Sequence, residues 1–85
     1  MKGHEASVES AVFSPDGQKV ISGSFDKSAK IWDAESGKEL LTLKGHEGTV
    51  ASVAFSLDGQ RVISASYDHS AIIWDAETGE ELLAL

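Results

Sequence analysis

The residue types of a hydrolytic triad occur twice in this 85-residue chain, in the same order and at the same spacing. The two sets are His4, Ser22 and Asp26, and then His46, Ser64 and Asp68. In a serine hydrolase the histidine takes the proton of the serine hydroxyl, and the aspartate holds the imidazole in the required orientation. Acyl transfer by a nucleophilic serine is therefore the first chemical hypothesis to weigh.

The elements that must position these residues favour a structural role for both serines. If residues 26–28 form the turn of a β-hairpin, Ser22 lies opposite Trp32. The second set repeats this arrangement, with Ser64 opposite Trp74. A hydroxyl beside a buried indole can accept its N–H, a donor that needs a partner away from water. We therefore expect each serine hydroxyl to accept a hydrogen bond from the tryptophan of its own repeat, and we expect no catalytic residue.

No other motif in the sequence predicts a metal or a cofactor. His46-Glu47 lacks a second histidine at the spacing of a zinc protease. Asp16-Gly17 and Asp58-Gly59 lack the alternating acidic ligands of a calcium loop. The one remaining histidine, His69, falls in a predicted turn, where we expect it to be solvated. We accordingly expect neither a cofactor nor a bound metal.

The chain is an internal repeat with a period of 42 residues. Residues 2–43 and 44–85 are identical at 28 of 42 aligned positions. The paired landmarks are Gly3-His4 and Gly45-His46, Asp16-Gly17 and Asp58-Gly59, and Trp32-Asp33 and Trp74-Asp75. A repeat of this length, with Gly-His early and Trp-Asp late, is typical of a β-propeller blade. We therefore divide the chain into a first blade at residues 1–43 and a second blade at residues 44–85.

Each repeat predicts four short strands separated by turns, and hence an all-β fold. The expected strands cover residues 8–14, 19–24, 29–32 and 39–43, and then 50–56, 61–66, 71–74 and 81–85. In the first strand, simple alternation predicts Val8 and Val12 on one face and Ala11 and Phe13 on the other. A sheet that is apolar on both faces must be covered on both, and radially packed blades supply that cover.

Composition limits the classes of partner. The formal net charge of −7 disfavours nucleic acid and anionic membrane surfaces, which bind clustered lysine and arginine. No apolar stretch approaches the roughly 20 residues of a membrane span, and no secretory signal opens the sequence. The absence of cysteine excludes disulfides and fits a reducing compartment. We expect a cytoplasmic protein that binds neither nucleic acid nor membrane.

Together, the Gly-His, Asp-Gly, turn Asp and Trp-Asp motifs resemble the WD-repeat (Trp-Asp repeat) β-propeller family over essentially the whole chain. The resemblance implies a buried structural network in each blade. By position, its members are His4, Ser22, Asp26 and Trp32, and then His46, Ser64, Asp68 and Trp74. It also implies a face at which partners dock, with candidate contacts at Ser7, Glu9, Phe25, Thr49, Ala51 and Tyr67. The alternative for the two aromatic rings is packing between neighbouring blades.

Two blades are too few for a closed ring, which typically holds four to eight. Each repeat supplies a whole blade, so we expect closure by blade-face packing between copies, a heterologous head-to-tail interface. We favour a homotetramer of eight blades, with a homotrimer of six as the runner-up. The predicted function is a non-enzymatic scaffold that self-assembles into a ring and presents a protein- or peptide-binding face. The alternative is a pure self-assembly unit, cut from or designed on a longer WD-repeat protein, with no ligand of its own.

Overall fold

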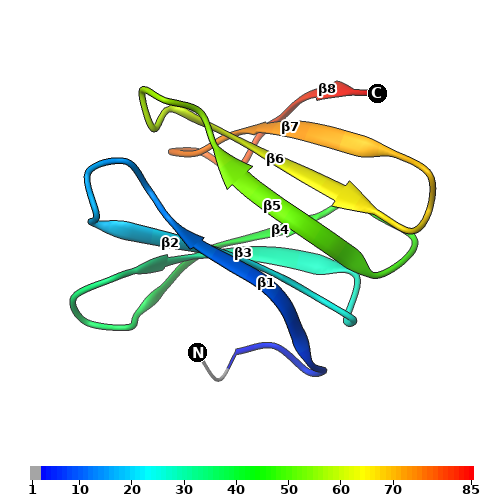
Figure 1. Ribbon diagram of the computed structural model, residues 1–85, viewed down its shortest axis with the longest axis horizontal. Helices are drawn as coiled ribbons and strands as arrows, with labels where there is room; N and C mark the ends of the chain where they lie inside the picture. The colour runs from blue at the N-terminus through cyan, green and yellow to red at the C-terminus, as the bar shows by residue number, and fades with distance from the viewer. Residues whose placement is uncertain (1–2) are drawn as a thin grey trace.

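Eight β-strands make up the computed structural model, which describes residues 3–85 (Figure 1). They are β1 (Val8–Phe13), β2 (Lys19–Ser24), β3 (Ser28–Asp33), β4 (Glu39–Lys44), β5 (Val50–Phe55), β6 (Arg61–Ser66), β7 (Ala71–Asp75) and β8 (Glu81–Ala84). Strands β1–β4 form one antiparallel sheet in sequence order, and β5–β8 form a second. We call these sheets blade 1 and blade 2. The first two residues of the predicted first blade lie outside the described residues.

The strands lie where the sequence predicts them, and each end that differs is shifted by one residue. Branched residues and short turns explain the agreement. In the turn after β1, the amide of Gly17 donates to the carbonyl of Ser14 at 2.9 Å, and Gly17 has φ of +75°. Glycine adopts that conformation without strain, so the Asp-Gly motif ends this turn. Within residues 3–85 no helix is long and apolar enough to cross a membrane.

A β-bulge near the start of β1 corrects the predicted faces of that strand. Its register with β2 shifts between Val8 and Ser10, which inserts one residue and reverses the alternation. Val8 is paired with Ser24 and Ala11 with Ser22, and these two serines share a face of β2. Val8 therefore lies on the same face as Ala11, and the prediction that Val8 and Val12 lie together is wrong.

The two blades pack face against face, with β5 lying across β1 and β2 (Figure 1). The buried apolar residues between them come from both blades: Ile21, Ala29, Ile31 and Leu43 from blade 1, and Val50, Val53, Val62, Ile72, Trp74 and Ala76 from blade 2. In each blade we call the face that carries Ile21, or its counterpart Ile63, the back face. The opposite face, which carries Val20 or its counterpart Val62, is the front face. The back of blade 1 thus packs on the front of blade 2.

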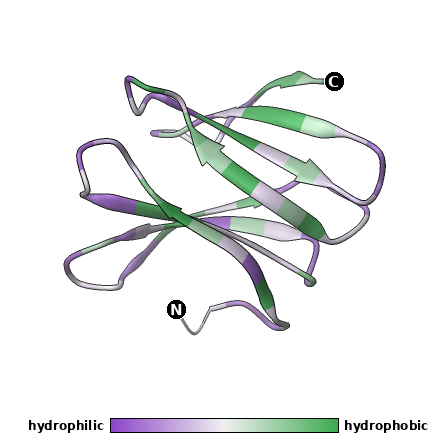
Figure 2. Ribbon diagram, viewed as in Figure 1, coloured by the Kyte–Doolittle hydropathy of each residue, from purple (hydrophilic) through white to green (hydrophobic). Residues whose placement is uncertain are grey.

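The equivalent faces on the outside of the pair are uncovered. Ile21 is fully buried on the back of blade 1, whereas its counterpart Ile63 on the back of blade 2 is 38% exposed. Leu43 is 1% exposed and its counterpart Leu85 is 64% exposed. Phe13, on the front of blade 1, is 68% exposed, whereas its counterpart in blade 2 is half-buried. Both outer faces therefore expose apolar side chains, and Figure 2 shows that hydrophobic residues recur along the strands of both blades.

Candidate functional site

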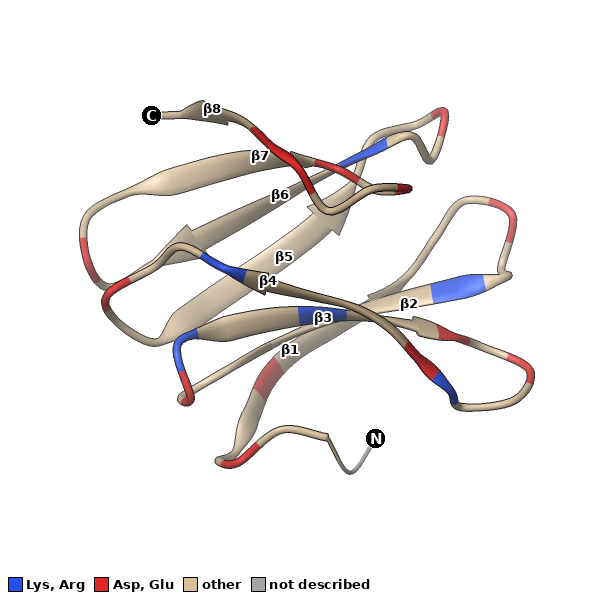
Figure 3. Cartoon of the chain, turned by 180° about the vertical axis from the view of Figure 1, so that it is seen from behind, with Lys and Arg blue, Asp and Glu red and all other residues tan. Residues whose placement is uncertain are grey.

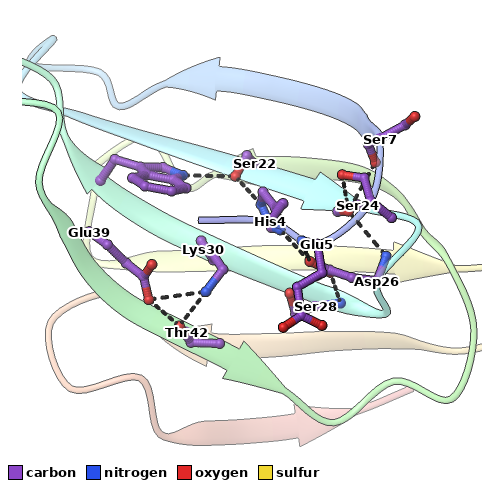
Figure 4. A network of polar contacts seen from close by, with 12 residues as sticks. His4, Glu5, Ser7, Ser22, Ser24, Asp26, Ser28, Lys30, Glu39 and Thr42 are labelled. Atoms are coloured by element: carbon purple, nitrogen blue, oxygen red, sulfur yellow. Dashed lines mark hydrogen bonds and ion pairs between the residues drawn. The ribbon is translucent and has the colours of Figure 1, made fainter. Parts of the chain in front are cut away.

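Four side chains of blade 1 form one hydrogen-bonded network (Figure 4). Trp32 Nε1 donates to Ser22 Oγ at 2.8 Å, and the same oxygen lies 2.7 Å from His4 Nε2. The other ring nitrogen, His4 Nδ1, lies 2.8 Å from Asp26 Oδ2. Because an ionised carboxylate only accepts, Nδ1 donates to Asp26 and Nε2 accepts the Ser22 hydroxyl proton. The Ser22 hydroxyl thus acts as acceptor and donor at once, and its residue is fully buried.

Blade 2 repeats the network at the equivalent positions. Ser64 Oγ accepts from Trp74 Nε1 at 2.8 Å and lies 2.7 Å from His46 Nε2. His46 Nδ1 lies 3.1 Å from Asp68 Oδ2, and the amide of Glu47 donates to that same oxygen at 2.8 Å. The segment between the blades is therefore bonded to the β6–β7 turn. Among the described residues, no buried side-chain nitrogen or oxygen lacks a partner.

The register of the hairpin differs from the one predicted. Ser22 pairs with Lys30, and Trp32 pairs with Val20, because Ser28 is the first residue of β3 rather than part of the turn. The Trp32–Ser22 bond forms all the same, since diagonal neighbours on one face of a sheet lie within reach of an aromatic side chain. The predicted opposition of serine and tryptophan is wrong, although the two residues do meet.

The turn aspartates anchor these networks through more partners than the sequence suggested. Asp26 accepts from the hydroxyl of Ser28 at 2.6 Å, from its amide at 3.0 Å and from the amide of Glu5 at 3.0 Å. Partial burial is the largest single influence and raises the pKa of Asp26, but these bonds and the one from His4 outweigh it and hold the pKa far below its usual range. Ser28 was missed in the sequence, where the Asp-x-Ser spacing of an Asx-turn is the signal that could have found it.

In blade 2 the hydroxyl of Ser70 holds the pKa of Asp68 far below its usual range, with further help from the amide of Glu47. Ser70 Oγ donates to Asp68 Oδ1 at 2.5 Å. Both aspartates are therefore ionised hubs at neutral pH, and each ties a turn to the segment that precedes its blade. Ser70 was missed for the same reason as its counterpart in blade 1.

The candidate partner contacts gather at one edge of each blade. In blade 1 the amide of Phe25 donates to the carbonyl of Ser7 at 3.0 Å, and Glu9 lies in the β1 bulge beside them. In blade 2 Tyr67 and Thr49 make the same bond at 3.0 Å. The aromatic residues remain 46% exposed at Phe25 and 68% exposed at Tyr67. The remaining candidate, Ala51, occupies the equivalent bulge of β5 and is half-buried.

The role of one charged residue inside a strand, Lys30, could not be predicted from the sequence. Lys30 Nζ donates to Glu39 Oε2 at 3.0 Å and to Thr42 Oγ1 at 2.9 Å, on the front face of blade 1 (Figure 4). Most other charges lie in turns and at strand ends (Figure 3). Blade 2 has Ile72 and Ala84 at the positions of the lysine and the threonine, so the two blades differ by a matched polar-to-apolar change.

Two successive four-stranded antiparallel sheets, packed back to front and each tied by a His–Asp–Ser–Trp network, are blades of a β-propeller. The 42-residue period and the network at its fixed positions narrow that class to one kind of repeat. The chain belongs to the WD domain, G-beta repeat family, whose model matches residues 1–33 and 37–75.

Known proteins are similar to this chain over one or both blades. Ribosome assembly protein 4 of Saccharomyces cerevisiae is 48% identical over 42 residues, which cover 49% of this chain and 8% of that protein. Vegetative incompatibility protein HET-E-1 of Podospora anserina is 60% identical over 37 residues, 44% of this chain and 3% of that protein. The crystal structure of RRP9 WD40 repeats superposes with a TM-score of 0.93 at 29% identity, over 99% of this chain and 27% of that one. The chain spans less than a tenth of these two curated relatives.

Proposed function

We propose that this chain is a non-enzymatic interaction scaffold, a blade pair that self-assembles into a closed ring and presents a protein- or peptide-binding face. The observation that carries the proposal is the exposure of counterpart residues. Apolar residues that are exposed on the outer faces of the pair have counterparts that are buried where the two blades meet. Leu85 is exposed, for example, whereas its counterpart Leu43 is buried. A surface that already packs well in one setting supplies the same complementarity to another copy.

The uncovered faces are large enough to drive association. Five aliphatic or aromatic side chains at about 1.5–3 kcal/mol each give a gross gain on the order of 10 kcal/mol per interface. The entropy of association offsets a sizeable part of this gain. A contiguous apolar surface of this kind typically marks an interaction site. We favour four copies and eight blades, with three copies and six blades as the runner-up.

The binding face is proposed at the edge that carries Phe25 and Tyr67. Both rings stay exposed after blade packing, and aromatic side chains supply much of the binding energy at protein interfaces. The non-enzymatic part of the proposal is supported by the burial of both triad serines, each 0% exposed. Their hydroxyls are engaged by tryptophan and histidine, which leaves no open nucleophile.

Sedimentation equilibrium tests the ring. The wild-type chain is expected at the mass of four copies, or of three if the blades pack at a wider angle. Leu83→Lys places a charge on the bare back face of blade 2, where Leu83 is 52% exposed, and should reduce the mass to one copy. Leu57→Lys is the matched control, because Leu57 is 97% exposed in a turn. A wild-type chain that stays at the mass of one copy refutes self-assembly.

Peptide selection on the assembled ring tests the binding face. A displayed peptide library should yield sequences whose binding is lost in rings that carry Phe25→Ala and Tyr67→Ala. Rings that form but enrich no peptide would favour the second candidate, a pure self-assembly unit. The observation that favours this candidate is the identity of 28 of 42 positions between the blades, since a selected binding face usually diversifies.

A further inference from the structure

The contact between the blades contains a glycine that cannot be replaced without movement. Gly23, on the back of blade 1, faces Val50 and Val53 on the front of blade 2. A Cβ at Gly23 would lie 2.6 Å from Val50 Cγ1 and 3.1 Å from Val53 Cγ1. Real Cβ atoms do not approach other atoms to 2.6 Å, so Val50 excludes a side chain at Gly23, and the Val50 carbonyl oxygen at 3.0 Å adds to this. Val53 narrows the same space, since it would have to move to accept a Cβ at 3.1 Å.

The outer faces carry the reverse distribution of size. The counterpart of Gly23 on the bare back of blade 2 is Ala65, so one carbon is added there. The counterpart of Val53 on the bare front of blade 1 is Ala11, so two carbons are removed. The enlargement of one outer face is thus matched by the reduction of the other. Two independent surfaces would not need this match, whereas two surfaces that meet would.

We propose that a second copy of this chain docks the back of its blade 2 on the front of blade 1, with Ala65 of one copy against Ala11 of the other. The inference rests on the proposed ring and names the contact that closes it. The contact replaces the glycine–valine pair within the chain by an alanine–alanine pair between chains. The two kinds of interface in the ring are therefore different.

The size match also rejects the wrong order of blades. If one blade 2 stacked on another, Ala65 would meet Val53, which overfills the contact. If one blade 1 stacked on another, Gly23 would meet Ala11, which leaves a gap and forfeits packing. Only the alternating order satisfies both contacts. Discrimination of this kind, by misfits built against the wrong partner, is a general source of specificity.

The second interface cannot be an exact copy of the first. At the spacing found within the chain, the Ala65 methyl group would meet the counterpart of Val50, which is Val8. Val8 is 39% exposed, and the smaller Ala11 beside it leaves room for the blades to shift. The interface between copies must therefore be displaced at this level, because the contact that Val8 would make with the Ala65 methyl group is too close at the spacing found within the chain.

A double-mutant cycle across the interface tests the pairing. In the single chain Ala11 is exposed and Ala65 is half-buried, so we expect variants at these positions to leave its fold intact. Ala11→Val should raise the midpoint concentration of assembly about tenfold, because it overpacks the contact. Ala65→Gly should raise it about fourfold, through the loss of one methyl group. The double variant recreates the valine–glycine pair and should return to within about threefold of the wild type.

The outcomes separate this inference from the ring itself. If the two single variants raise the midpoint concentration independently, so that the double variant shows the product of their fold-changes, the Ala11–Ala65 pairing is overturned. The proposed ring would still stand if the wild-type chain assembles. A wild-type chain that does not associate overturns both. Leu57→Phe is the control for added volume, since Leu57 is 97% exposed in a turn, and it should not change the midpoint.

Discussion

Removal of one hydroxyl from the network should destabilise a blade far more than its size suggests. Ser22→Ala deletes the acceptor of the Trp32 indole N–H and the partner of His4 Nε2, at 2.8 and 2.7 Å. Each buried polar group left without a partner costs about 1–3 kcal/mol, so we expect a loss of about 2–6 kcal/mol from the two groups. Chains of this length have total stabilities of about 4–13 kcal/mol, so the loss is a large fraction of the whole.

Urea unfolding followed by tryptophan fluorescence measures this loss, since each blade carries one tryptophan. All variants are compared at one protein concentration, because the proposed association would add to apparent stability. Ser64→Ala should match Ser22→Ala, since its network has the same two distances. Ser36→Ala, at an exposed turn position, should stay within about 0.5 kcal/mol of the wild type.

The comparison also has an internal check. Adding Trp32→Phe to Ser22→Ala removes the orphaned N–H, so the second substitution should cost less in that background than in the wild type. If Ser22→Ala and Ser64→Ala both unfold within about 0.5 kcal/mol of the wild type, the network does not hold the blades together and the structural role is refuted.

Two further perturbations test the turns. Lys27 has φ of +74°, a left-handed conformation that costs a residue with a side chain about 1–2 kcal/mol. Lys27→Gly should therefore raise the free energy of unfolding by about 1 kcal/mol, whereas the control Lys38→Gly, at an exposed position, should not. A lower free energy of unfolding for Lys27→Gly would contradict the strain. The depressed pKa of Asp26 supplies stability that is fully present above the unfolded pKa of about 3.9 and is lost as the pH falls below it. Asp26→Asn should therefore flatten the loss of urea stability between about pH 5 and pH 2, and an unchanged slope would sink the assignment.

The strands could be predicted because strand positions follow from turn chemistry and residue type, and because the repeat shows each pattern twice. The register between paired strands was harder to predict. The prediction counted Ser28 as a turn residue, whereas the left-handed conformation of Lys27 lets the three-residue turn close at Ser24 and Ser28. The bulge near Val8 was also missed, because no residue type there signals it.

The candidate network was reached mainly through the family resemblance, which supplied residues that lie more than twenty positions apart. The Ser28 hydroxyl was signalled by the Asp-x-Ser spacing and was overlooked. The Glu5 amide could not be predicted, because its bond to Asp26 depends on how the turn folds back on the preceding segment. The Lys30–Glu39–Thr42 cluster escaped for a similar reason, since its members come from two strands.

The bonds at the segment between the blades have a mechanical consequence. This segment leaves β4 at Lys44 and enters β5 at Val50, and between them His46 and Glu47 are both fastened to Asp68. The segment is thereby fastened to blade 2, and the buried faces of the two blades set the angle between them. In the proposed ring, chains that share one such angle should give a uniform blade number. Loss of Asp68 would free the segment, and we expect a mixture of ring sizes from chains whose strands remain folded.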